Sequence, residues 1–137
     1  MIRLLEDVLV VDASAMIELL RRTPAGVAIE QRLLGGRVVV NAPELFDVEV
    51  AQVLRRYVQR GMMSAERAKA SLDIVADFPI RRHSHGPLMA RVWELRENLT
   101  AYDAAYVALT EGLRGTLITR DAKLAESPGH TAQVELI

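Results

Sequence analysis

Four acidic residues stand at places in the sequence where carboxylates can gather into a metal site. They are Asp12, Glu49, Asp103 and Asp121. Three of them lie just past a short apolar run or at the start of a helical pattern. In an open α/β sheet such positions converge on one crevice outside the carboxyl ends of the strands. Because crowded carboxylates repel one another, the set predicts a divalent metal ion and an enzyme that acts on phosphate.

Asp12 and Asp121 each have an ordinary structural role available, as the cap of a following helix. Asp12 follows the apolar run 8–11, and Ser14 offers a hydroxyl two residues further on. Thr119 precedes Asp121 by two residues and, because side chains alternate along a strand, lies on the same side of the extended chain. Hydroxyls beside acids suit a hydrated metal ion or a positioned water.

Capping explains Glu49 less readily than it explains Asp103. Glu49 lies past the first turn of its helix among apolar neighbours, so its carboxylate needs a partner. That partner is either an arginine such as Arg56 or a metal site, and we favour the metal site. Asp103 stands three residues after Thr100, which is the spacing of a capping box. Such a box does not prevent the Asp103 carboxylate from pointing into a crevice.

Apolar runs alternate with helical patterns along the chain. Strands are expected at 8–11, 38–40, 78–82 and 116–119, with a short fifth strand at 134–137. Helices are expected before the break at Thr23-Pro24, from there to Gly35, and over 43–60, 64–77, 87–97, 101–111 and 122–125. This alternation predicts an α/β fold with a doubly wound, mostly parallel sheet of four to five strands, in a single domain spanning 1–137.

Composition limits the kinds of partner that can be expected. The 17 basic and 18 acidic residues give a net charge of −1, so overall charge makes no case for nucleic-acid binding. The candidate phosphate contacts are Arg21-Arg22, Arg55-Arg56 with Arg60, and Arg81-Arg82. Each of these groups fits a solvated surface equally well. The aromatic residues mostly fit helical core spacing, so stacking on nucleotide bases is not predicted.

Cysteine is missing from the sequence, which excludes disulfides, thiolate nucleophiles and cysteine-bound zinc. His83 and His85 are expected to form a polar pair at the surface, and His130 to be solvated in a loop. Segment 1–7 carries acids where a signal peptide would need an apolar run. No segment approaches the ~20 apolar residues of a membrane span, so a cytoplasmic protein is expected.

Four stretches carry the most recognisable sequence. They read VVDASA at 10–15, APEL at 42–45 leading to Glu49 and to LRR at 54–56, YDAAYVAL at 102–109, and LITRDAKL at 117–124. In this order and spacing the chain resembles the PIN-domain ribonucleases and, within them, the VapC-like toxins of bacterial toxin–antitoxin pairs. The resemblance runs from about residue 8 to residue 124 without a departure at the acidic positions. The middle, 61–98, carries no diagnostic motif.

The resemblance implies a PIN-like three-layer α/β/α fold and a metal-dependent endoribonuclease that cleaves RNA by hydrolysis. It implies that Asp12, Glu49, Asp103 and Asp121 bind Mg²⁺ or Mn²⁺, with Ser14 and Thr119 beside them. It also implies a homodimer and a VapB-like antitoxin whose chain wraps the toxin and blocks the acidic pocket. The helical pair around 44–76 is rich in apolar residues, which suits a groove for a dimer partner or for the antitoxin.

Two other functions remain open at this point. A catalytically inactive α/β interaction module would use the acidic residues only as helix caps and would not bind Mn²⁺. A phospho-acceptor receiver domain or another metal-dependent phosphatase is the second alternative. A receiver needs paired acids after the first strand and a lysine after the last one. Here Asp12 stands unpaired and Lys123 follows Asp121, so the layout differs.

Overall fold

The computed structural model describes residues 6–137 of the chain. The expectation about segment 1–7 therefore falls largely outside the described residues. The sheet has five strands, all parallel, in the order β3-β2-β1-β4-β5. They are β1 (Asp7–Val11), β2 (Val38–Pro43), β3 (Ile80–His83), β4 (Thr116–Thr119) and β5 (Gln133–Leu136). The predicted α/β fold with a parallel sheet is confirmed.

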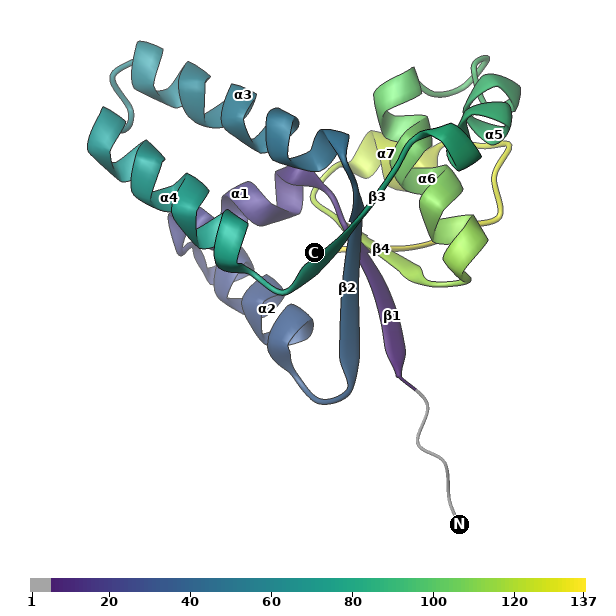
Figure 1. The fold of residues 1–137 in the computed structure, drawn as a ribbon, viewed down its shortest axis with the longest axis horizontal. Helices are drawn as coiled ribbons and strands as arrows, with labels where there is room; N and C mark the ends of the chain where they lie inside the picture. Colours follow the sequence, from purple (N-terminus) through teal and green to yellow (C-terminus); the bar gives the residue numbers. More distant parts are fainter. Residues whose placement is uncertain (1–5) are drawn as a thin grey trace.

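Helices connect successive strands. They are α1 (Ala13–Arg21), α2 (Pro24–Leu34), α3 (Leu45–Gln59), α4 (Ala65–Asp77), the short 3₁₀ helix η1 (Gly86–Leu88), α5 (Met89–Glu94), α6 (Ala101–Leu113) and α7 (Ala122–Glu126). Figure 1 shows α1 to α4 on one side of the strands and α5 to α7 on the other, with α3 and α4 extending as a hairpin. The sheet with helices on both of its sides forms the three-layer α/β/α arrangement.

The central strands are buried on both faces by these helices. Leu9, Val10 and Val11 of β1 and Leu117 and Ile118 of β4 are fully buried. Strands covered on both faces read as continuous apolar runs, which is why the sequence located β1 and β4 closely. The outermost strands are shorter or less buried, and their bounds shift by one or two residues from those expected.

Strand order places a topological switch point between β1 and β4. The chain passes from β1 to β2 and β3 in one direction and then returns to β4 and β5 on the opposite side. Ligands of such sheets bind in the crevice outside the carboxyl ends of the strands at the switch point. The receiver fold has the strand order 2-1-3-4-5, so the receiver alternative does not fit this chain.

Two expected elements differ from the structure. Pro43, which was expected near the start of a helix, ends β2, and α3 begins at Leu45. The helix expected over 87–97 is divided into η1 and α5 and ends at Glu94, where tight turns replace it. Pro43 lies at the first departure and Pro87 lies within η1, whereas turn hydrogen bonds after Glu94, and no proline, end α5.

Helices α1 and α2 pack so closely at Gly26 that this position has no room for a larger side chain. A Cβ atom at Gly26 would lie 2.0 Å from the carbonyl oxygen of Glu18 in α1. We expect Gly26→Ala to lower the free energy of unfolding by about 1–3 kcal/mol or more, because the helices must move apart. Urea denaturation followed by circular dichroism measures the change.

Gly112 of α6 provides the matched control. It is helical, and a Cβ built there meets nothing within 4 Å. Gly112→Ala is expected to stabilise the protein by about 0.5–1 kcal/mol, because alanine loses less conformational freedom in a helix. Equal effects of the two substitutions would contradict the packing argument.

Candidate active site

Asp12 sits at the switch point, directly after β1, with its side chain only 6% exposed. Its Oδ1 atom accepts hydrogen bonds from Ser14 Oγ at 2.7 Å and from the backbone N–H of Ala15 at 2.9 Å. Its Oδ2 atom accepts a hydrogen bond from the hydroxyl of Thr119. Asp12 is thus the N-cap of α1 and is also held from β4, so it is both a cap and a rigid group in the crevice.

Ser14 and Thr119 connect the ends of the two central strands. Their hydroxyl oxygens lie 3.4 Å apart, and both bond to Asp12. The backbone N–H of Arg120 donates to Ser14 Oγ at 3.1 Å, and that of Asp121 donates to Thr119 Oγ1 at 3.0 Å. The two hydroxyls predicted as supporting residues therefore orient Asp12 and fix the chain that leads to Asp121.

Glu49 reaches the same region from α3. It is half-buried, and the phenol of Tyr106 in α6 donates to its Oε1 atom at 2.6 Å. An ion pair with Arg56, the structural alternative, does not occur within residues 6–137. Burial and the neighbouring Glu49 carboxylate raise the pKa of Tyr106, so the phenol stays protonated and acts as a donor.

Tyr106 was not among the residues that the sequence indicated. It follows Asp103 by three positions on α6, which places the two side chains on the same helix face. Its role depends on α3 meeting α6, and apolar periodicity alone indicates only a core tyrosine. The spacing from Asp103 is the signal that was available.

The acidic residues influence one another's protonation. Burial is the main cause that raises the pKa of Asp12, Glu49 and Asp103. Repulsion adds to it: Asp103 raises the pKa of both Asp12 and Glu49, and Asp121 raises that of Asp103. Hydrogen bonds from Thr119 and Tyr106 oppose the rise at Asp12 and Glu49. All four predicted acids therefore lie in one electrostatically coupled region.

No arginine or lysine forms an ion pair with any of these four acids among the described residues. Within residues 6–137, no group of three acidic or histidine side chains is close enough to hold a metal ion without rearrangement. The donors present are carboxylate and hydroxyl oxygens, the ligands preferred by hard cations such as Mg²⁺. The donor set fits such an ion, and the metal assignment remains a prediction.

The chain matches the PIN domain family over residues 9–129. It belongs to this family. Ribonuclease VapC12 of Mycobacterium tuberculosis is 43% identical over 129 residues, covering 94% of this chain and 98% of the relative. Ribonuclease VapC1 of the same organism is 39% identical over 132 residues, covering 96% of this chain and 98% of the relative. The resemblance seen in the sequence is confirmed.

Two solved structures share the PIN fold with this chain. VapBC2 from Rickettsia felis, bound to a DNA fragment from its promoter, has a TM-score of 0.71 at 13% identity and covers 94% of this chain and 98% of its own. VapC20 from Mycobacterium tuberculosis, a Sarcin-Ricin loop cleaving toxin, has a TM-score of 0.65 at 15% identity, with coverage of 85% and 92%. These TM-scores show a common fold.

Within residues 6–137, the hydrogen bonds of the three histidines go to groups other than the four acids. His83 Nε2 lies 2.8 Å from Asn41 Oδ1, and His85 Nε2 accepts from the backbone N–H of Leu45 at 3.0 Å, which caps α3. The expectation of a surface pair is wrong, because both rings are half-buried. His130 was expected to be solvated, but its Nδ1 accepts from the N–H of Ala132 and its Nε2 is buried without a partner among the described residues.

The arginine groups predicted for phosphate are partly used within the fold. Arg82 forms two hydrogen bonds with the Asp47 carboxylate, and Arg22 pairs with Glu30. The side chains at 55, 56, 60 and 81 are exposed. From residue 6 onwards, no helix combines the length and the apolar character that crossing a membrane requires.

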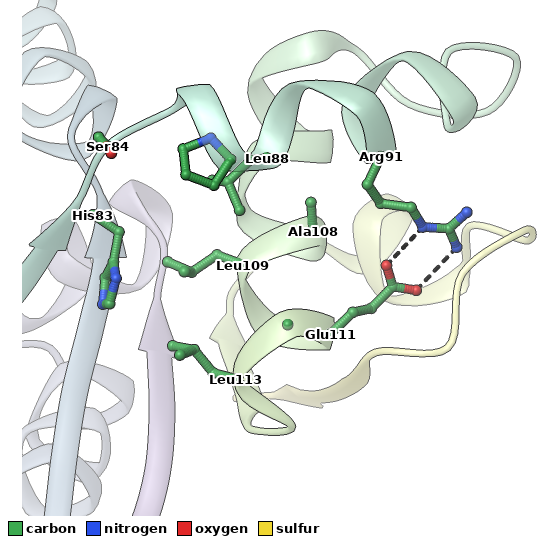
Figure 2. Close-up of a pocket in the computed structure, with 10 residues that line it drawn as sticks. His83, Ser84, Leu88, Arg91, Ala108, Leu109, Glu111 and Leu113 are labelled. Atoms are coloured by element: carbon green, nitrogen blue, oxygen red, sulfur yellow. Dashed lines mark hydrogen bonds and ion pairs between the residues drawn. The ribbon is translucent and has the colours of Figure 1, made fainter.

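A cavity of about 550 Å³ lies apart from the acids, between the end of β3, η1, α5 and the second half of α6. Figure 2 shows that its wall includes Arg91, which forms two hydrogen bonds with Glu111, at 2.8 and 3.0 Å. Glu111 also accepts from the N–H and the hydroxyl of Thr131. These contacts lower the pKa of Glu111 to about 2 and join α5, α6 and the segment before β5. None of the four acids lines this cavity.

This ion pair predicts a pH-dependent contribution to stability. Because the folded pKa of Glu111 is about 2 and its ordinary value is 4.5, the stabilisation is complete above 4.5 and is lost as the pH falls towards 2. We expect Glu111→Gln to lower the free energy of unfolding at pH 7 by about 1–3 kcal/mol. The difference from the unsubstituted protein should shrink between pH 4.5 and pH 2. Urea titrations across this range measure it.

Glu94→Gln is the control for this prediction. Glu94 lies 3.5 Å from the same arginine, but its side chain is 63% exposed. An exposed ion pair contributes about 0–1 kcal/mol, so this substitution should have little effect. A difference at Glu111 that persists unchanged at low pH would contradict the proposed role of its charge.

Proposed function

We propose that this PIN domain is a metal-dependent endoribonuclease that hydrolyses RNA phosphodiester bonds and acts as the toxin of a toxin–antitoxin pair. The observation that carries the proposal is the coupled set Asp12, Glu49, Asp103 and Asp121 at the switch point, whose charges lack a cationic partner within residues 6–137. Relatives that are named ribonucleases over nearly the full chain support the reaction class.

Each acidic residue has a proposed role. Asp12 and Asp103 would hold the metal directly or through water, and Glu49 and Asp121 would complete the set or orient the attacking water. Ser14 and Thr119 fix the Asp12 carboxylate by the hydrogen bonds described above, and the phenol of Tyr106 fixes Glu49. A bound Mg²⁺ or Mn²⁺ would lower the pKa of a water molecule and stabilise negative charge on the attacked phosphate.

The alternative of an inactive interaction module explains only part of this arrangement. Asp12 and Asp121 do cap α1 and α7, and the Asp103 N–H is bonded to Thr100 in the first turn of α6. Glu49 caps nothing, because it lies in the second turn of α3 with its carboxylate directed to Tyr106. A half-buried acid that stabilises no helix end favours the catalytic proposal.

An antitoxin of the VapB type is the proposed protein partner, with the α3–α4 hairpin as its binding surface. A groove of about 310 Å³ between these helices is lined by Leu54, Val58, Ala68 and Leu72. On the same hairpin Val48, Met62 and Ile74 are more than half exposed. Apolar surface of this kind suits a partner helix. A homodimer is also proposed, and analytical ultracentrifugation of the purified protein measures it.

The first test of this proposal is RNA cleavage by the purified chain. Total RNA is incubated with the protein in Mn²⁺, in Mg²⁺ or in EDTA, and the products are mapped by sequencing. We expect metal-dependent cleavage, reduced at least 100-fold by Asp12→Asn, Asp103→Asn or Glu49→Gln, because each removes a charge that holds the metal. In Asp12→Asn the amide oxygen can accept from Ser14 and from the N–H of Ala15, and the amide NH₂ can donate to the hydroxyl oxygen of Thr119. In Glu49→Gln the amide oxygen can accept from Tyr106, so circular dichroism should show folded variants.

Glu44→Gln is the matched control in the same assay. Glu44 stands at the start of α3 with an exposed side chain and forms no capping hydrogen bond. Its substitution should leave cleavage unchanged. Cleavage that survives in the three acid variants, or that persists in EDTA, would count against the acidic site.

Metal binding gives a second prediction that does not depend on activity. Raised carboxylate pKa values favour the folded state at low pH, and this contribution is lost as the pH rises through them and the ionised groups repel. Saturating Mn²⁺ should therefore raise Tm by about 5–10 °C at pH 7 and by less as the pH falls. Differential scanning calorimetry measures both trends.

Asp103→Asn should reduce this effect of Mn²⁺ and, without metal, should raise Tm at pH 7, because it relieves repulsion on Asp12 and Glu49. A Tm that does not respond to Mn²⁺ at any pH would favour the interaction module, in which the acids are only caps.

A further inference from the structure

Tyr102 is an exposed aromatic residue next in sequence to Asp103, and it stands four positions before Tyr106, on the helix face from which Tyr106 reaches Glu49. It precedes Asp103 in the first turn of α6, after the N-cap Thr100, and its side chain is 65% exposed. Its hydroxyl has no hydrogen-bond partner within residues 6–137. The Tyr102 ring therefore stands in water at the end of α6 that carries Asp103.

Comparison with the other aromatic residues sets Tyr102 apart. Phe46 and Tyr106 are buried, and Tyr57 and Phe78 pack against the core. Trp93 is 68% exposed, but the guanidinium of Arg96 lies 4.7 Å from the centre of its ring. In the described part of the chain, Tyr102 is thus the largely exposed ring that has no cation over its face.

The charge around Tyr102 limits how the site can hold RNA. Asp103 is the adjacent residue, and it is coupled to Asp12, Glu49 and Asp121. A lysine or arginine at this position would pair with the carboxylates and would compete with a metal ion for them. A neutral ring can stack on any base without disturbing the acidic charge, and such stacking does not depend on base identity.

We propose that the ring of Tyr102 stacks on an unpaired base of the RNA next to the phosphate that is cleaved. Stacking requires that this base be unpaired, because a base inside a duplex has both faces covered by its neighbours. This inference rests on the proposed ribonuclease function and adds a residue that binds the substrate base.

The test uses the cleavage site mapped in total RNA. A fluorescent RNA of about 12 nucleotides that spans this site, without secondary structure, is titrated with protein and its anisotropy is measured. All proteins carry Asp12→Asn to prevent cleavage. Adding Tyr102→Ala should weaken binding about 5- to 150-fold, the range expected for loss of one stacked base. Tyr102→Phe keeps the ring and should bind within twofold of the parent.

Trp93→Ala is the matched control, since it removes an exposed aromatic whose face Arg96 covers. Its affinity should equal that of the parent. An exposed side chain contributes little to folding, so the Tm of Tyr102→Ala should also be unchanged. Annealing the complementary strand should reduce binding of the parent protein by as much as Tyr102→Ala does.

An abasic scan separates stacking from an indirect effect on structure. Each nucleotide of the RNA is replaced in turn by an abasic residue, which removes one base and leaves the backbone. One position near the cleaved phosphate should weaken binding to the protein with Tyr102 and have no effect on the Tyr102→Ala protein. If Tyr102 acted only through the structure, each abasic replacement would weaken binding by the same factor in the protein with Tyr102 and in the Tyr102→Ala protein.

The possible results separate this inference from the proposed function. If Tyr102→Ala binds like its parent, if the abasic losses are the same in both proteins, or if the duplex binds as well as the single strand, stacking by Tyr102 is wrong. Metal-dependent cleavage that is lost in Asp103→Asn would then still support the ribonuclease. If the unsubstituted chain cleaves no RNA, both the inference and the proposed function fail.

Discussion

Folding removes the carboxylate of Asp12 from water, and donors from the protein replace the water it loses. Two of these donors come from the start of α1, and the third is Thr119 at the end of β4. A buried acid is tolerable only when its oxygens are hydrogen-bonded. The register of β1 beside β4, with Val11 opposite Ile118, brings Thr119 within reach. The position of Asp12 thus depends on the central strand pair, and the rest of the acidic site is arranged around it.

Glu49 joins this region through a contact between the two helical layers. Its partner Tyr106 lies on α6, on the opposite side of the sheet from most of α3 in Figure 1. The start of α3 is in turn held by His85, whose ring nitrogen accepts from the N–H of Leu45, and by the ion pair of Asp47 with Arg82. Strand β3 and the segment that follows it therefore fix the helix that carries Glu49. Capping of α3 by a histidine from another element replaces the local cap that Glu44 does not provide.

Sequence patterns located the features that depend on local physics. Continuous apolar runs identified β1 and β4, and Thr100 marked the start of α6 correctly. The acidic positions were also visible: Asp12, Asp103 and Asp121 each follow a strand or open a helix, and Glu49 is an acid among apolar helical neighbours. The sequence did not indicate contacts between distant elements. Three such contacts join residues 20 to 57 positions apart: Tyr106 with Glu49, His85 with Leu45, and Arg91 with Glu111. Those contacts depend on how the layers pack, and apolar periodicity carries no information about them.

The same acids that suit catalysis work against the stability of the metal-free fold. Burial and mutual repulsion raise the pKa of Asp12, Glu49 and Asp103, so keeping them ionised at neutral pH costs free energy. Among residues 6–137, the fold offsets part of this cost with neutral donors, namely hydroxyls, a phenol and backbone N–H groups, and not with lysine or arginine. A cationic side chain would have neutralised the site permanently. Neutral donors hold the carboxylates in place and leave their charge available to a cation, which is the arrangement that a metal-dependent nuclease needs.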